Sequence, residues 1–240
     1  MSSCSRCPPG KINTDPYATD AGLHDAGSDC NPCPSGKFSS TDSSSCIVCP
    51  AGTYVFNMSS CEFCTSGRYA PTAVNDDCIS CPAGLHTKVL LGASTCTACD
   101  AGTYSAALAV NCTLCNVGRS SRTQAPNCTK CIPGFHAAFE GSSSCSACAG
   151  GSATGEIYGA SACFSCPEGT FQAETGQAAC RVCSTGSYAD STGTLSCTAC
   201  AAGYYVNKTG SKECDVCPIG TAQPAAGTTS CRECVAGKYS

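Results

Sequence analysis

Cysteine is the residue type in this chain that could do chemistry, and its spacing is regular throughout. All 28 cysteines among the 240 residues stand in C-x-x-C pairs, and after a first step of 26 residues the pairs recur every 15–18 residues. Thiols at this spacing can form disulfides, hold zinc or act in redox reactions. A repeat of nearly fixed length along the whole chain is typical of an array whose units stack on their neighbours.

Zinc binding is one hypothesis that the spacing leaves open. Two C-x-x-C pairs about 15–20 residues apart match a Cys₄ zinc site, as in an intracellular zinc-binding protein. The surroundings favour disulfides, because the 13 Lys and Arg residues are scattered singly and form no basic face for nucleic acid. The segments between the pairs are rich in Ser, Thr, Gly and Ala, which suits an extracellular protein. We therefore predict disulfides, with no metal, no cofactor and no nucleic-acid partner.

Other cysteine chemistry does not fit the neighbouring residues. Covalent haem attachment needs a histidine directly after the second cysteine, and bacterial iron–sulfur binding needs a third cysteine in the same run; neither occurs. The three histidines are His24, His86 and His136, and no nucleophile or metalloprotease motif accompanies them. His86 and His136 occupy a slot that is aromatic in other copies, so we interpret them as packing residues. The sequence predicts a protein that is not an enzyme.

The composition explains why cysteines have to hold the fold. Only 30 of the 240 residues are Leu, Ile, Val or Phe, whereas the cysteine content exceeds the roughly 8–10% that marks disulfide scaffolds. So few large apolar side chains cannot offset the conformational entropy of ordering the chain. The longest aliphatic run, residues 89–91, is too short to span a membrane. These numbers exclude a conventional domain with a single hydrophobic core.

Each pair is followed by residues that favour a turn and a short strand. A glycine stands three residues after the second cysteine in every copy, and the residue two positions further on is usually aromatic. Proline often follows the second cysteine, so C-P-x-G predicts a tight turn, with β character after it. No window carries a helical apolar period. We predict small disulfide-rich repeats, an elongated rod or solenoid of short β-hairpins and loops with essentially no helix, in which the aromatic rings pack on cystines.

Two regular connectivities suit the period, and the sequence does not decide between them. In the first, the second cysteine of one pair bonds to the first cysteine of the next; in the second, two repeats close first to first and second to second. We favour the first, because the period does not alternate in twos. Its bonds include Cys33–Cys46, Cys49–Cys61, Cys64–Cys78 and Cys81–Cys96. It leaves Cys4 and Cys234 without partners, so we predict that copies link head to tail through them or that the array continues in a longer protein.

We divide the chain into three parts. They are a first repeat with a long insertion (residues 1–29), tandem repeats of about 17 residues (30–230) and a truncated last repeat (231–240). A solvated loop is the first interpretation of the insertion, and a calcium site or a lateral contact is the second. Its acidic residues and histidine are Asp15, Asp20, His24, Asp25 and Asp29.

The cysteines and the sequons indicate an extracellular or cell-surface location. Disulfides persist in oxidising compartments. Four Asn-x-Ser/Thr sequons add a modest signal in the same direction. The predicted N-glycosylation sites are Asn57, Asn111, Asn127 and Asn207.

Several stretches resemble a known module. Residues 46–54 (CIVCPAGTY), 96–104 (CTACDAGTY) and 163–171 (CFSCPEGTF) are similar to the ephrin-receptor-like cysteine-rich repeat. That repeat is similar to modules of growth-factor receptors and tumour-necrosis-factor receptors, and long arrays of it are typical of protist surface proteins, such as ciliate immobilisation antigens and Giardia variant surface proteins. The resemblance covers essentially the whole chain. It implies an extracellular, disulfide-bonded, elongated structure without enzymatic activity.

Two functions compete at this stage. The first is a structural extracellular protein, a secreted or surface-bound subunit of a coat, appendage or filament that associates with further copies. The second is a ligand-binding or adhesive ectodomain of receptor type, which should carry an exposed aromatic or charged cluster in one or two repeats. The copies that depart from the aromatic slot, with Ser120, Ala153 and Ala222, lose side chains there instead. We therefore favour the structural function.

Overall fold

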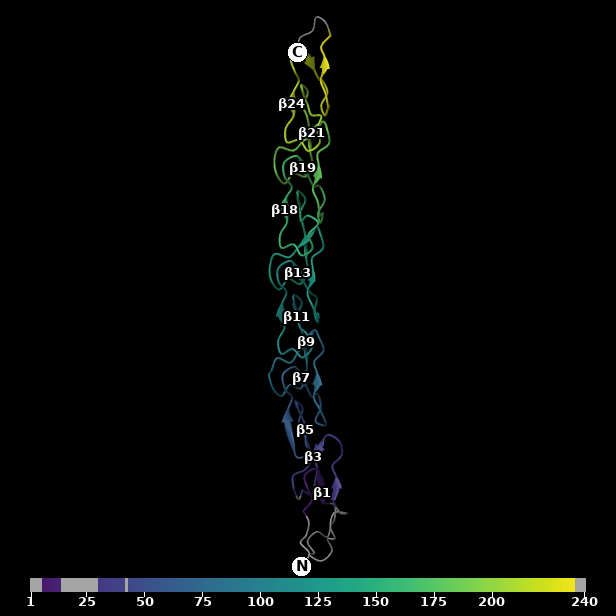
Figure 1. Cartoon of the computed structure of the whole chain (residues 1–240), viewed down its shortest axis with the longest axis vertical. Helices are drawn as coiled ribbons and strands as arrows, with labels where there is room; N and C mark the ends of the chain where they lie inside the picture. Colours follow the sequence, from purple (N-terminus) through teal and green to yellow (C-terminus); the bar gives the residue numbers. More distant parts are fainter. Residues whose placement is uncertain (1–5, 14–29, 42, 236–240) are drawn as a thin grey trace, which may run out of the picture. The chain divides into compact units, whose positions relative to one another are not determined.

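The structure, a computed structural model, describes residues 6–13, 30–41 and 43–235. These residues form short β-strands, turns and bends, without a helix among them. No part of the described chain is therefore a helix that could cross a membrane. Paired strands are antiparallel, two to a sheet and consecutive in sequence, so the chain is a series of hairpins (Figure 1). The predicted fold class, small disulfide-rich repeats of hairpins without helix, is confirmed.

The chain divides into two compact units, residues 1–113 with 123–127 and residues 114–122 with 128–240. The strands of the first unit are β1 (Lys11–Asn13), β2 (Cys30–Pro32), β3 (Lys37–Phe38), β4 (Ile47–Val48), β5 (Thr53–Phe56), β6 (Ser60–Phe63), β7 (Arg68–Tyr69), β8 (Ile79–Ser80), β9 (Leu85–His86), β10 (Thr97–Ala98) and β11 (Thr103–Tyr104). Strand β12 (Thr113–Leu114) spans the boundary in sequence. Those of the second are β13 (Arg119–Ser120), β14 (Thr129–Lys130), β15 (Phe135–His136), β16 (Ser146–Ala147), β17 (Ser152–Ala153), β18 (Phe164–Ser165), β19 (Thr170–Phe171), β20 (Arg181–Val182), β21 (Ser187–Tyr188), β22 (Thr198–Ala199), β23 (Tyr204–Tyr205), β24 (Asp215–Val216), β25 (Thr221–Ala222) and β26 (Arg232–Glu233). The three-part division made from the sequence stays a prediction.

Each hairpin joins the strand after a turn to the two residues inside the next cysteine pair. In β21 and β22, Ser187 pairs with Ala199 and Tyr188 pairs with Thr198. The glycine before the first strand has a left-handed backbone, with φ of 80° at Gly186, which glycine adopts without strain because it lacks a Cβ. We call this residue, three positions after the second cysteine, the motif glycine.

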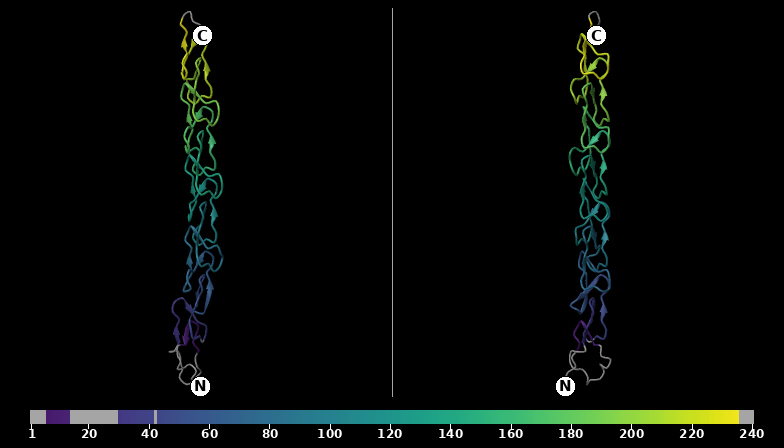
Figure 2. Two further views of the ribbon diagram at one scale, coloured as in Figure 1. Left: turned by 180° about the vertical axis from the view of Figure 1, so that it is seen from behind. Right: turned by 90° about the vertical axis from the view of Figure 1, so that its right-hand side faces the viewer.

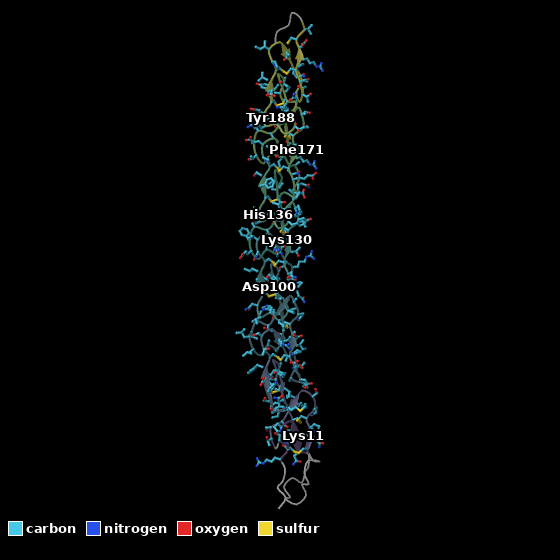
Figure 3. All side chains as sticks on the ribbon, viewed as in Figure 1. Lys11, Asp100, Lys130, His136, Phe171 and Tyr188 are labelled. Atoms are coloured by element: carbon cyan, nitrogen blue, oxygen red, sulfur yellow. A yellow bond between two sulfur atoms is a disulfide. The ribbon has the colours of Figure 1, made fainter. Side chains whose placement is uncertain are left out.

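The interior consists of cystines and small side chains. The second cysteine is at most 1% exposed in ten pairs, at Cys49, Cys64, Cys81, Cys99, Cys115, Cys131, Cys148, Cys166, Cys183 and Cys200. The residue after the aromatic slot is also buried and usually small, as at Ser39, Ala70, Thr87, Ser105, Ser121, Ala137, Thr154 and Ala189. Figure 3 shows the sulfur atoms along the inside of the ribbon and the longer side chains pointing outward. Cystines thus replace the hydrophobic core that the composition excludes.

Within each unit the repeats follow one another in the order of the sequence (Figure 2). Isolated parallel bridges connect successive repeats, from Tyr104 to Ala125 in the first unit and from His136 to Ala160 in the second. The stacking therefore uses backbone hydrogen bonds in addition to the disulfides.

Candidate functional site: the cystines and the stacking site

The described residues contain thirteen disulfides, and each joins the second cysteine of one pair to the first cysteine of the next. The eight cysteines named from the sequence form the bonds Cys33–Cys46, Cys49–Cys61, Cys64–Cys78 and Cys81–Cys96. The other bonds are Cys7–Cys30, Cys99–Cys112, Cys115–Cys128, Cys131–Cys145, Cys148–Cys163, Cys166–Cys180, Cys183–Cys197, Cys200–Cys214 and Cys217–Cys231. Cys234 is the free thiol of the described residues and is half-buried, whereas Cys4 lies outside them. A link between these two cysteines stays a prediction.

Neither histidine of the aromatic slot stands in a set of free metal ligands. His86 Nδ1 lies 2.9 Å from the carbonyl oxygen of Val110. His136 Nδ1 lies 3.2 Å from Cys163 Sγ, and with Cys148 these residues are close enough to share an ion. Cys148 and Cys163 are bonded to each other, however, so their sulfurs are not the thiolates that zinc requires.

The predicted insertion, with Asp15, Asp20, His24, Asp25 and Asp29, lies outside the described part of the chain.

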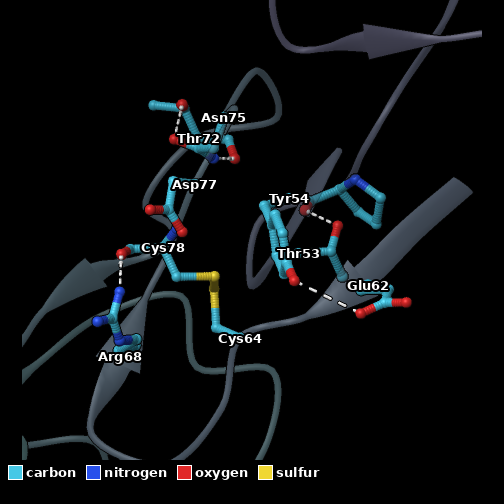
Figure 4. The surroundings of a disulfide bond; sticks show 10 residues. Thr53, Tyr54, Glu62, Cys64, Arg68, Thr72, Asn75, Asp77 and Cys78 are labelled. Carbon is cyan, nitrogen blue, oxygen red and sulfur yellow. Dashed lines mark hydrogen bonds between the residues drawn. A yellow bond between two sulfur atoms is a disulfide. The ribbon is translucent and has the colours of Figure 1, made fainter. Parts of the chain in front are cut away.

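Tyr54 illustrates the aromatic slot. Its ring packs against Cys64, Ala70 and Cys78, and Cys64 and Cys78 form one cystine (Figure 4). Its hydroxyl donates a hydrogen bond to Glu62 Oε2 at 3.4 Å. Desolvation, followed by the negative charge of Glu62, raises the pKa of Tyr54 above its usual value. The ring thus covers a cystine while its polar end stays at the surface.

A second left-handed position, which the sequence analysis missed, connects the repeats. It lies four residues before the first cysteine of a pair, and we call it the turn residue. Its φ is between 60° and 82° at Gly92, Leu108, Gln124, Gly141, Gly159, Gly176, Gly193, Gly210 and Gly227. The sequence does contain a signal for this position, because glycine often stands four residues before the first cysteine of a pair. An alignment of the copies on their second cysteines obscures this glycine, because the intervening segments differ in length.

The amide of the turn residue binds the preceding repeat. Gly210 N donates to the carbonyl oxygen of Cys183 at 2.8 Å. The same bond, at 2.7–2.9 Å, links Gly92 to Cys64, Leu108 to Cys81, Gln124 to Cys99, Gly141 to Cys115, Gly159 to Cys131, Gly176 to Cys148, Gly193 to Cys166 and Gly227 to Cys200. Every one of these acceptors is the second cysteine of a pair.

The carbonyl of the turn residue lies against the motif glycine one repeat further back. A Cβ placed on Gly169 would lie 2.1 Å from Gly210 O, a separation that side chains essentially never show. The equivalent separations are 2.0–2.3 Å for Gly52 with Gly92, Gly67 with Leu108, Gly84 with Gln124, Gly118 with Gly159, Gly134 with Gly176, Gly151 with Gly193 and Gly186 with Gly227. The motif glycine is therefore required twice, by its left-handed φ and by this close approach.

We call the place that receives a turn residue the stacking site. For Gly210 it is formed by Gly169, by the carbonyl of Cys183, and by Val182, whose Cγ1 lies 4.0 Å from a Cβ placed on Gly210. Gly169 and Cys183 belong to different repeats, and Gly210 belongs to a third. Three consecutive repeats are thus held together by contacts that depend almost entirely on the backbone.

Two motif glycines use a side chain as acceptor. In most copies the glycine N–H donates to a backbone carbonyl, as from Gly52 to Ala70 at 2.9 Å. Gly36 N instead donates to Asp76 Oδ1 at 2.6 Å, and Gly134 N donates to Thr154 Oγ1 at 2.6 Å. The hydroxyl of Ser35, and then the amide of Gly36, lower the pKa of Asp76 below its usual value.

All four sequon asparagines are accessible. Asn57, Asn111, Asn127 and Asn207 are exposed. Glycosylation at these residues stays a prediction.

Consecutive cystine-closed hairpins without helix define a cysteine-rich repeat protein of the kind found in receptor ectodomains. The family model described as "Tyrosine-protein kinase ephrin type A/B receptor-like" matches residues 52–91, 155–200, 173–213 and 203–240, more than half of the chain. The chain belongs to this family. No curated protein matches it. Repeats of this family are non-catalytic, and together with the many disulfides they point to an extracellular or cell-surface location.

Proposed function

We propose that the protein is a non-enzymatic structural component of the extracellular space, a subunit of a coat, appendage or filament. The observation that carries the proposal is the stacking site, which recurs along both units with the same backbone contacts. Surface side chains can vary without disturbing these contacts, because the turn residue binds through its N–H and C=O groups.

The energetics support a spacing role. Each disulfide closes a short loop, and such closures contribute on the order of 3 kcal/mol by restricting the unfolded chain. In arrays of this kind, stability is roughly the sum of the stabilities of the repeats and of the contacts between neighbours. Adding repeats therefore adds length without requiring a larger core, and the rod expected from the sequence is the shape that suits this role.

Electron microscopy of the native material tests the proposal. We expect the protein in coats or filaments, labelled along their length by antibodies against the repeats. Isolated molecules, each attached to a cell and in contact with none of its own kind, would contradict a structural subunit and favour a receptor.

The receptor-type ectodomain is the second candidate, favoured by the family and by one cavity of the second unit. This cavity has a volume of about 520 Å³. Its wall includes Glu168, Tyr188, Asp190, Tyr204, Lys212 and Glu213. Carboxylates beside tyrosine rings suit a Lys or Arg side chain of a partner.

An oligolysine peptide is a direct probe of this second candidate. Binding measured by calorimetry should weaken in Asp190→Asn and stay unchanged in Asp215→Asn, an exposed residue outside the cavity wall. Equal binding by both variants would remove the cavity as support for a receptor.

A further inference from the structure

One cystine of the second unit has a histidine against it. His136 Nδ1 lies 3.2 Å from Cys163 Sγ, and Cys163 is bonded to Cys148. Other copies put a different side chain in the same place, such as the ring of Tyr54 or the hydroxyl of Ser120, which lies 3.4 Å from a cystine sulfur. The aromatic slot thus holds its side chain against the cystine of the next repeat, and at His136 that side chain is an imidazole.

The imidazole and the two sulfurs form a set of potential metal ligands. Their ligand atoms all lie within 4.8 Å of one another, and among the described residues this is the one such group of three. Cys148 is 0% exposed, whereas His136 and Cys163 are half-buried. Thiolate sulfur and imidazole nitrogen are ligands that zinc prefers in proteins. What separates this set from a zinc site is the bond between its two sulfurs.

We infer that reduction of Cys148–Cys163 creates a zinc site whose ligands are the two cysteine sulfurs and His136 Nδ1. Two molecules of a small thiol supply the electrons, so the protein disulfide becomes two thiols and the reagent becomes one disulfide. Zinc then displaces the two thiol protons, and His136 binds through the lone pair of Nδ1 with its proton on Nε2. The inference goes beyond the structural function and does not depend on it.

Backbone contacts hold the three ligands in place when the S–S bond opens. The Cα atoms of Cys148 and Cys163 are 5.7 Å apart, a separation that two Zn–S bonds of about 2.3 Å each can bridge. Gly176 N donates to Cys148 O at 2.8 Å, which ties this cysteine to a turn residue. His136 is paired with Ser146 in the β15–β16 hairpin. None of these contacts uses a sulfur atom.

The adjacent cysteines do not supply a fourth ligand. Cys145 and Cys166 stand in the same C-x-x-C pairs as the two cysteines of the site, and both are bonded in disulfides of their own. The site therefore has three protein ligands. Zinc sites of this kind leave the fourth position to water or to a group of a bound molecule.

His86 provides a matched comparison within the chain. It occupies the same slot in an earlier copy, where the cystine of the next repeat is Cys99–Cys112. His86 Nδ1, however, lies 2.9 Å from Val110 O, and His86 belongs to no group of three ligands among the described residues. A histidine in the slot is therefore not sufficient, because its ring also has to face the sulfur.

Equilibrium reduction of the full chain tests the inference. The protein is held in glutathione buffers of increasing thiol-to-disulfide ratio, with and without zinc at a fixed free concentration. Free thiols are trapped by alkylation, and each cystine is followed by mass spectrometry. We expect zinc to lower the ratio of [GSH]² to [GSSG] that opens Cys148–Cys163 by about tenfold once free zinc is about ten times its dissociation constant, because the metal binds only the reduced form.

His136→Phe and His86→Phe form a matched pair of variants. Phenylalanine occupies the slot in other copies, as at Phe171, so both variants keep an aromatic ring over the cystine. A complete disulfide map of each oxidised variant checks that it folds. His136→Phe should remove most of the zinc effect, because one of the three ligands is lost, whereas His86→Phe should leave it unchanged.

A second readout reports the ligands directly. At the glutathione ratio that opens Cys148–Cys163, cobalt(II) in place of zinc should give thiolate-to-metal charge-transfer absorption that His136→Phe weakens. Zinc effects of equal size in the two histidine variants, a zinc effect of the same size at Cys99–Cys112, or no zinc effect on any cystine would each overturn the inference.

Discussion

Two stretches of the second unit contain the same motif in different surroundings. Around Gly169 and Gly186 the motif glycine is buried beneath a carbonyl from the repeat two positions further on. Around Gly203 and Gly220 no described atom lies within 4 Å of a Cβ placed on the glycine, although the backbone is unchanged. One repeat is therefore not a complete structural unit, because the motif glycine, the cysteine carbonyl and the turn residue of a stacking site come from three repeats.

Removal of a disulfide should give the largest contrast between the two stretches. Cys166→Ser with Cys180→Ser opens a loop of the interior, and Cys217→Ser with Cys231→Ser opens one at the end. Both lose about 3 kcal/mol of loop-closure stabilisation. The interior variant should also free Gly193 from Cys166 O, so its amide hydrogen exchange should rise. Disulfide mapping by mass spectrometry controls for rearranged bonds, and slow exchange of Gly193 in the interior variant would contradict the three-repeat unit.

Alanine at the motif glycine should give the next largest contrast. Gly186→Ala and Gly203→Ala both introduce a left-handed alanine, but only the first places a methyl group against Gly227 O. We expect Gly186→Ala to cost about 1–3 kcal/mol more than Gly203→Ala in dilute solution, by overpacking. Amide exchange of Gly227, whose N–H donates to Cys200 O, measures the difference locally. If both variants were equally stable, the close approach would have no energetic weight.

Substitution at the turn residue should give a smaller effect. Gln124 has φ of 60°, so Gln124→Gly should stabilise the first unit by about 1 kcal/mol, the usual cost of a left-handed non-glycine residue. Gly210→Ala should destabilise the second unit by a similar amount. Thermal unfolding of both variants tests this pair of predictions. If both substitutions shifted the unfolding temperature in the same direction, φ would not be the deciding factor.

Acid should weaken the hydrogen bond from Gly36 N to Asp76 and leave the bond from Gly52 N to Ala70 unchanged. We expect this to be the smallest effect of the series. The folded-state pKa of Asp76 is lowered, so its contribution is present above the unfolded pKa of about 4 and is lost as pH falls through the folded pKa. Gly52 donates to the carbonyl of Ala70, which does not titrate in this range. NMR chemical shifts of the two glycine amides measure the contrast. Asp76→Asn should remove the pH dependence at Gly36, and its persistence would point to another titrating group.

Sequence reasoning reached the hairpins because their determinants are local. A glycine that permits a left-handed φ, a proline before it and a short β-prone dipeptide act within a few residues of each other. It did not reach the stacking site, whose partners, such as Gly169 and Gly210, are about 40 residues apart. It also missed the buried position after the aromatic slot, which holds small side chains such as Ser39, Ala70 and Ala137 in most copies and Gln172, Val206 or Gln223 in others.

The regular cysteine pairs were sufficient to predict a repeat array. With 28 cysteines in such pairs and few large apolar residues, the composition excludes a conventional hydrophobic core and favours a disulfide-rich array over a zinc-bound one. The contacts between repeats come from the tertiary structure. Gly186 and Gly203 stand in the same local sequence pattern, and among the described residues only Gly186 has the carbonyl oxygen of a turn residue within 4 Å of a Cβ placed on it. The close approach of a turn carbonyl to a motif glycine depends on the fold of a repeat two positions further along the chain. No local pattern of residues contains that information.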